Sequence, residues 1–187
     1  MDKLFHVIIF LCTFFGIAVL GILLFDIFSD GIKWLSTDFF RNFASRFPDK
    51  SGIRAALAGS LWVISLTTLF AFPIGVSAAI YLEEYAQKNR LTRLIQLDIS
   101  NLAGVPSIVY GILGLAVFVN ILGFGRSILS GALTLALLIL PVIIVSSQEA
   151  LKSVPTELRT GSYALGASKL QTVLHVVIPY ALPGILT

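Results

Sequence analysis

Side chains capable of catalysis or metal binding are few in this sequence, and they lie far apart. His6 and His175 fall in different segments, and the single cysteine, Cys12, has no second cysteine to pair with. We interpret His175 as a partly buried helix residue, not a metal ligand. Glu83 and Glu84 stand side by side where an apolar stretch ends, and we expect them to be solvated end charges, not an acid–base pair. These residues predict no enzyme activity, no cofactor site and no metal site.

Uncharged stretches of membrane-spanning length dominate the chain. Of its 187 residues 57% are hydrophobic and 12% are charged, with a mean hydropathy of +0.94, whereas soluble domains carry about 25% charged residues. A helix crosses a bilayer with roughly 20 apolar residues, and four uncharged stretches are that long: 4–25, 55–82, 99–125 and 127–148. The sequence therefore predicts an all-α, polytopic transmembrane helical bundle. A soluble enzyme, a disordered tail, a disulfide-rich secreted domain and an outer-membrane barrel are excluded.

A further apolar stretch stands at the C-terminal end. Residues 176–187 carry no charge and are expected to begin a fifth span, which predicts a chain truncated at its C-terminus. The net charge of +3 is interpreted as loop charge near lipid headgroups, not as a surface for nucleic acid. The loop Lys and Arg residues divide 7 against 6 between the two sides of the bilayer, which is too even to orient the spans.

The connection after the fourth stretch, residues 149–179, is the most informative segment. Its pattern predicts two short helices joined at Gly166, because glycine readily takes the left-handed conformation that ends a helix. Ser168 and Gln171 have the spacing of a capping box at the start of the second helix. We expect such a compact helical pair either to dock on a partner or to lie on the lipid surface.

Further local signals refine these two helices. Ser153 or Thr156 is expected to cap the first helix, and Pro179 is expected to stop or kink the second. The second helix also carries an apolar stripe with helical spacing, which consists of Leu170, Val173, Leu174 and Val177.

The same segment resembles the cytoplasmic coupling loop of ATP-binding-cassette importer permeases. The family pattern is Glu-Ala-Ala, three residues, Gly, nine residues, Ile-x-Leu-Pro, and the run from Gly166 to Val176-Val177-Ile178-Pro179 matches its second half. Thr160-Gly161-Ser162 stands where the family has Glu-Ala-Ala. The resemblance implies contact with an ATPase by Glu157, Thr160, Gly161, Ser162, Gly166, Ala167 and Pro179.

Three further runs are similar to the permeases of high-affinity phosphate importers, particularly the second of their two permease subunits. These runs are 101–114, 122–125 and 131–136. The resemblance implies that 1–187 is a single permease domain of a family with six spans, in the bacterial inner membrane. It places the coupling loop between the fourth and fifth spans, and hence the N-terminus on the cytoplasmic side.

The resemblance also implies partners. These are a second permease subunit, two ATP-binding subunits and an extracytoplasmic phosphate-binding protein, besides membrane lipid and without nucleic acid. The sequence lacks the Gly-x4-Gly-Lys-Ser/Thr loop that cradles ATP phosphates, so ATP hydrolysis is expected on a separate subunit.

A phosphate path would need hydrogen-bond donors within the spans. The candidates are Thr67, Thr68, Asn101, Ser107 and Tyr110. The position matching Val145 often carries an arginine in the phosphate family, whereas here it is apolar. Two alternatives remain open: a permease for molybdate, sulfate or an organic solute, and a membrane scaffold or secondary-transporter fragment. Secondary transporters normally carry ionisable residues inside their spans, whereas these four stretches contain no Asp, Glu, Lys or Arg.

Overall fold

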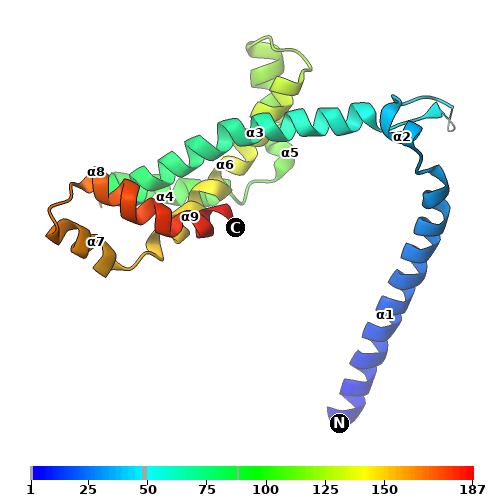
Figure 1. Ribbon diagram of the computed structural model, residues 1–187, viewed down its shortest axis with the longest axis horizontal. Coiled ribbons are helices and arrows are strands. Elements are labelled where there is room, and N and C mark those ends of the chain that lie inside the picture. Colours follow the sequence, from blue (N-terminus) through cyan, green and yellow to red (C-terminus); the bar gives the residue numbers. More distant parts are fainter. Residues whose placement is uncertain (1, 48–49, 88) are drawn as a thin grey trace. The chain divides into compact units, whose positions relative to one another are not determined.

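The computed structural model describes residues 2–47, 50–87 and 89–187, and in these ranges the regular structure is entirely helical (Figure 1). This confirms the predicted all-α class. The chain divides into two compact units, residues 1–59 and 60–187, with α3 beginning in the first and continuing into the second.

The first unit consists mainly of one long helix, α1 (Asp2–Gly31). Its described side chains are almost all exposed, as expected for a helix apolar on every face that meets lipid. A short 3-10 turn, η1 (Ile32–Trp34), and a small helix, α2 (Thr37–Arg41), follow. α2 begins where the Ser36 side chain accepts a hydrogen bond from the backbone N–H of Phe39, which satisfies a free donor of its first turn.

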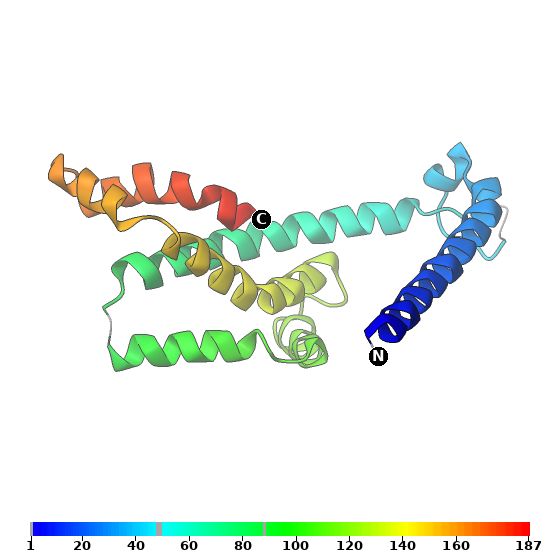
Figure 2. The same ribbon diagram turned by 90° about the horizontal axis from the view of Figure 1, so that it is seen from below.

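The second unit consists of long and short helices with three π-helical turns among its described residues. In chain order its elements are α3 (Arg54–Ile80), η3 (Tyr81–Tyr85), α4 (Arg90–Leu102), α5 (Ser107–Gly114), η4 (Leu115–Ile121), α6 (Ile128–Lys152), α7 (Thr156–Ala164), α8 (Lys169–Thr172), η5 (Val173–Val177) and α9 (Ile178–Leu186). Figure 2 shows the chain reversing after η3, so that α4 runs opposite to α3.

Four segments are long and apolar enough to cross a membrane: Lys3–Trp34, Arg54–Tyr85, Ile128–Lys152 and Lys169–Leu186. The first two contain the stretches predicted at 4–25 and 55–82, and the third contains all of 127–148 except its first residue. The stretch predicted at 99–125 differs, because it straddles a break between α4 and α5, where the pair Arg90–Leu102 and Ser107–Ile121 bends by 98°.

The break between α4 and α5 has a local cause. Pro106 has no backbone N–H and disfavours helical geometry in the residue before it, so the chain leaves the helix there. The carbonyl of Leu102 at the end of α4 accepts from the Val105 N–H at 3.1 Å and from the Tyr110 hydroxyl at 2.9 Å, so both sides of the break hydrogen-bond to it.

The last of these segments, Lys169–Leu186, begins earlier than the fifth span that the sequence predicts from residue 176. Its helix begins at Lys169 and continues through Pro179 to Leu186. Pro179 therefore does not stop the helix, and a kink there, the other expected effect, stays a prediction. Pro179 falls in the first turn of α9, directly after the π-helical turn η5.

The core of the second unit lies where α3, α6 and α9 meet. Its buried members are Ala79, Ile144, Leu151, Val154, Val177 and Ala181. Close approach depends on glycines: a Cβ on Gly75 would lie 2.6 Å from Ile143 Cγ2, and one on Gly114 would overlap the side chain of Thr134.

Candidate functional site

The loop helices α7 and α8 project beyond the end of α6. α7 begins after Pro155, whose backbone is extended and which gives no side-chain cap. The prediction that Ser153 or Thr156 caps this helix is wrong: Ser153 Oγ donates to the carbonyl of Ala150, and Thr156 Oγ1 donates to Glu157 Oε1.

A sharp corner joins the two helices as predicted. Gly166 has φ of +84°, a conformation that side-chain-bearing residues rarely adopt. The predicted capping box is present with both of its hydrogen bonds: the Ser168 side chain accepts from the Gln171 N–H, and the Gln171 side chain accepts from the Ser168 N–H. Across the corner the hydroxyls of Ser162 and Thr172 lie 2.9 Å apart, which ties α7 to α8.

The predicted apolar stripe on the second helix is only half buried. Val173 and Val177 are 2% and 0% exposed, whereas Leu170 and Leu174 are 59% and 50% exposed. η5 is π-helical and has more residues per turn than an α-helix. Its buried residues are therefore spaced four apart, and not alternately three and four apart as an α-helix would require. Ala181, four residues further along, continues the buried line.

A partly buried arginine connects α7 to the ends of two candidate spans. Arg159 Nη2 and Nε donate to Glu84 Oε1 at 2.9 and 3.3 Å. Its Nη1 donates to the carbonyl of Val154 at 2.6 Å, and its Nη2 also donates to the carbonyl of Leu151 at 2.9 Å. The Arg159 and Glu84 side chains are only 18% and 8% exposed. We call these four groups the Arg159 anchor.

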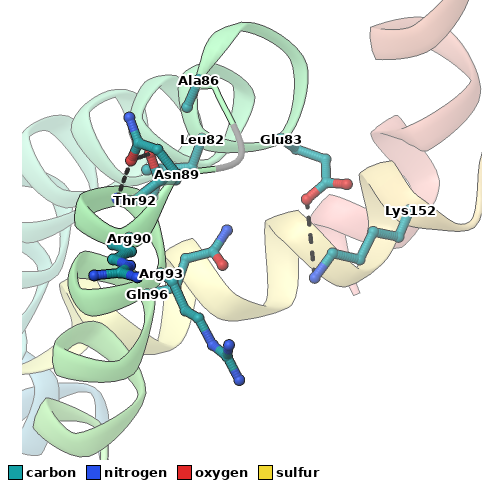
Figure 3. Close-up of a pocket in the computed structure, with 9 residues that line it drawn as sticks. All are labelled: Leu82, Glu83, Ala86, Asn89, Arg90, Thr92, Arg93, Gln96 and Lys152. Atoms are coloured by element: carbon teal, nitrogen blue, oxygen red, sulfur yellow. Dashed lines mark hydrogen bonds and ion pairs between the residues drawn. The ribbon is translucent and has the colours of Figure 1, made fainter.

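The residues on either side of Glu84 also contact the segment around α7. Glu83 Oε2 lies 3.8 Å from Lys152 Nζ at the end of α6, an ion pair that Figure 3 shows as a dashed line. The Lys169 ammonium lies 5.0 Å from the centre of the Tyr85 ring, within range of a cation–π interaction. Three consecutive residues of η3 thus make three separate contacts: Glu83 with the end of α6, Glu84 with α7 and Tyr85 with α8.

The interpretation of the adjacent acids as solvated charges is therefore wrong for Glu84. Its carboxylate is buried and paired, and the partner lies 75 residues further along the chain. One signal could have suggested the pair, because Arg159 is the only arginine in residues 149–187.

The residues expected to contact an ATPase divide into an outer and an inner group. Glu157, Thr160 and Gly161 are exposed on α7. Ser162 faces Thr172, and the N–H of Ala167 donates to the Ser162 carbonyl at 3.2 Å. Leu165, at the corner between α7 and α8, is 90% exposed and is the most exposed large apolar side chain of the loop. No pattern in the sequence selects it.

The polar residues proposed for a translocation path are not gathered in one place by the structure. Thr67 Oγ1 donates to the carbonyl of Ala132 on α6 at 3.2 Å, and Tyr110 bonds across the α4–α5 break. Thr68, Asn101 and Ser107 are exposed. Among the described residues no hydrogen bond joins any two of these five, and no cluster of three or more His, Cys, Asp or Glu is placed to hold a metal ion.

Comparison with known proteins identifies the family. The family model of the binding-protein-dependent transport system inner membrane component matches residues 71–187, which include the loop helices, the Arg159 anchor and the last ten residues of α3. The chain belongs to this family. Together with its apolar helices, this membership makes it a multi-pass membrane protein.

Individual members of the family are similar along much or all of the chain. The probable ABC transporter permease protein YqgI of Bacillus subtilis is 38% identical over 186 residues, which is 100% of this chain and 63% of that protein. The phosphate transport system permease protein PstA of Pasteurella multocida is 33% identical over 186 residues, 100% of this chain and 66% of that protein. PstA 1 of Mycobacterium tuberculosis is 40% identical over 136 residues, 73% of this chain and 44% of that protein. The chain thus spans 44–66% of the length of these relatives.

Proposed function

We infer that this chain is a permease subunit of an ATP-driven phosphate importer, and that residues 153–177 carry motion from ATP-binding subunits to its spans. The Arg159 anchor is the observation that supports this most strongly. A segment that transmits force must be fixed to the helices it moves, and this anchor joins α7 to the end of the second span and to the end of α6.

The exposed part of α7 and its corner supply a docking face in this proposal. Leu165 is 90% exposed, and Leu158 and Tyr163 are 40% and 43% exposed. Short helices that dock in a groove present such apolar anchors to the partner. Glu157, Thr160 and Gly161 share the same exposed helix and would border the contact.

The proposed assembly follows the family. A second permease subunit, two ATP-binding subunits and an extracytoplasmic phosphate-binding protein complete it, with ATP hydrolysis on the ATP-binding subunits. The loop then lies in the cytoplasm, as does the N-terminus.

Phosphate is the proposed cargo because PstA proteins of two organisms, named as phosphate transport permeases, are 33% and 40% identical to this chain. Thr67, Thr68, Asn101, Ser107 and Tyr110 remain proposed path residues. A permease for another solute is the second candidate, since the name of YqgI specifies no solute.

Substitution of the exposed corner tests the proposal. Leu165→Asp should reduce retention of co-expressed ATP-binding subunits at least tenfold and abolish phosphate uptake in a strain lacking its own importer permease. An exposed site tolerates such a change within about 0.5 kcal/mol of stability, so the variant should still fold. Leu165→Met, which keeps the apolar side chain, is the matched control.

Three outcomes discriminate between the candidates. Full retention and uptake by Leu165→Asp would contradict the docking role. Retention of ATP-binding subunits by the unsubstituted protein without phosphate uptake would favour another solute. A protein that retains no ATP-binding subunit at all would be a scaffold.

A further inference from the structure

A cavity next to the Arg159 anchor has no role in the function proposed so far. It lies between the end of η3, the first turns of α4 and the last turn of α6, and has a volume of about 770 Å³ (Figure 3). Sites for small molecules have volumes of about 300–1,000 Å³. Its polar lining consists of Glu83, Asn89, Arg90, Thr92, Arg93, Gln96 and Lys152.

The charge in this cavity favours an anion. Three of its side chains are cationic and one is a carboxylate, and that carboxylate, Glu83, already faces Lys152 at 3.8 Å. Arg90 and Arg93 form no ion pair with any residue that the structure describes. Because they are three residues apart on α4, they are neighbours on one side of that helix.

The start of α4 adds hydrogen-bond donors to this charge. Asn89 caps the helix, and its Oδ1 accepts from the backbone N–H and the hydroxyl of Thr92 at 2.8 and 3.0 Å. With the oxygen so engaged, the amide nitrogen of Asn89 is the group left to donate. The N-terminus of this 13-residue helix carries partial positive charge at the same end.

The position of the cavity suits a phosphate group at the depth of lipid headgroups. Glu83 and Lys152 stand at the ends of the candidate spans Arg54–Tyr85 and Ile128–Lys152, so the cavity lies where hydrocarbon gives way to water. Beside the two arginines, α4 exposes apolar side chains, with Leu91 and Leu94 at 65% and 57% exposure. Arginine presents paired donors that match two oxygens of a phosphate.

We propose that this cavity binds a phosphate group through Arg90 and Arg93, supplied either by an anionic lipid headgroup or by inorganic phosphate. The lipid source is independent of the proposed transport function. The inorganic source rests on it, because the cavity would then be a station for cargo at the cytoplasmic end of the spans.

Two binding measurements separate the sources. The protein is purified from membranes with the subunits that accompany it and placed in nanodiscs. Native mass spectrometry counts the phosphatidylglycerol molecules retained, and equilibrium dialysis measures binding of radiolabelled inorganic phosphate. The variant is Arg90→Gln/Arg93→Gln, and the matched control is Arg126→Gln, an arginine in the loop before α6.

The double variant should bind one of the two probes at least tenfold more weakly, since a charge-assisted hydrogen bond contributes about that factor. The control should stay within twofold of the wild type. Loss of phosphatidylglycerol alone assigns a lipid site, and loss of inorganic phosphate, alone or with lipid, assigns a cargo site. Arg90→Lys/Arg93→Lys, which keeps both charges, should retain part of the affinity and serves if the glutamine variant does not assemble.

Two results would overturn the proposal. One is a double variant that binds both probes as tightly as the wild type, and the other is a wild type that binds neither. Phosphate uptake is measured on the same preparations, so a failure of transport is distinguished from a failure of binding.

Discussion

The two partners of the Arg159 anchor should contribute unequally to stability, because Arg159 makes four hydrogen bonds and Glu84 accepts only two of them. Arg159→Gln removes all four and leaves a carboxylate that is 8% exposed without compensation. Removing one partner of a buried ion pair costs about 3–5 kcal/mol. Glu84→Gln leaves the two carbonyl bonds of Arg159 in place and should cost about 1.5–3 kcal/mol.

The double variant gives the decisive number. Glu84→Gln/Arg159→Gln has no buried charge left over, so its cost should fall below the sum of the single costs. Contacting residues show interaction energies of about 0.5–3 kcal/mol, and this pair should lie near the upper end. The free energy of unfolding is measured by titrating a denaturing detergent into mixed micelles and following helix content by circular dichroism.

An exposed ion pair provides the control. Lys33 and Asp30 lie 3.3 Å apart with side chains 71% and 76% exposed, and such pairs contribute at most about 1 kcal/mol. Lys33→Gln should therefore change stability little. If the Glu84 and Arg159 costs add to within about 0.5 kcal/mol, the two residues act independently and the account of the anchor is wrong.

Two further predictions concern helix packing in the second unit. Gly114→Ala should destabilise the protein by about 1–3 kcal/mol because its Cβ would overlap Thr134. A Cβ at Gly111 on the same helix meets nothing within 4 Å, so Gly111→Ala should stabilise the protein by up to about 1 kcal/mol through helix propensity. Equal effects of the two variants in the same unfolding assay would refute the close contact at Gly114. Tyr110→Phe should cost about 0.5–1.5 kcal/mol, because the Leu102 carbonyl loses the hydroxyl but keeps the Val105 N–H. It should also speed proteolysis between α4 and α5, and unchanged cleavage there would contradict the role of that hydroxyl.

Local signals in the sequence predicted the features that depend on a few neighbouring residues. Charge-free runs coincide with three of the four described helices that are long and apolar enough to cross a membrane, because a bilayer of fixed thickness needs about 20 apolar residues. Gly166, Ser168 and Gln171 predicted the corner and the capping box because those motifs close within a few residues.

Features that depend on distant partners or on subtle helix geometry escaped prediction. The pairing of Glu84 with Arg159 joins residues 75 positions apart, and no local pattern encodes it. The bend at Pro106 was hidden by an uninterrupted apolar run, since hydropathy reports length and not direction. The π-helical turn at Val173–Val177 shifted the buried side of that helix, and with it the exposure of Leu170 and Leu174.

The cluster formed by η3 explains how one span end could control the loop. Glu83, Glu84 and Tyr85 contact Lys152, Arg159 and Lys169 in turn. A displacement of α7 would therefore pull on the end of the second span through the ion pair between Arg159 and Glu84. Because this pair is largely shielded from solvent, water cannot readily replace its hydrogen bonds if they break.

The proposed coupling is tested most directly by Arg159→Lys in the assembled importer, reconstituted in proteoliposomes. Lysine keeps the positive charge opposite Glu84 but lacks the planar donors that reach both backbone carbonyls. The measurement is the number of phosphate ions taken up per ATP hydrolysed. We predict a fall of at least threefold in this ratio while ATP hydrolysis continues. An unchanged ratio would contradict the claim that the Arg159 anchor transmits motion from the loop to the spans.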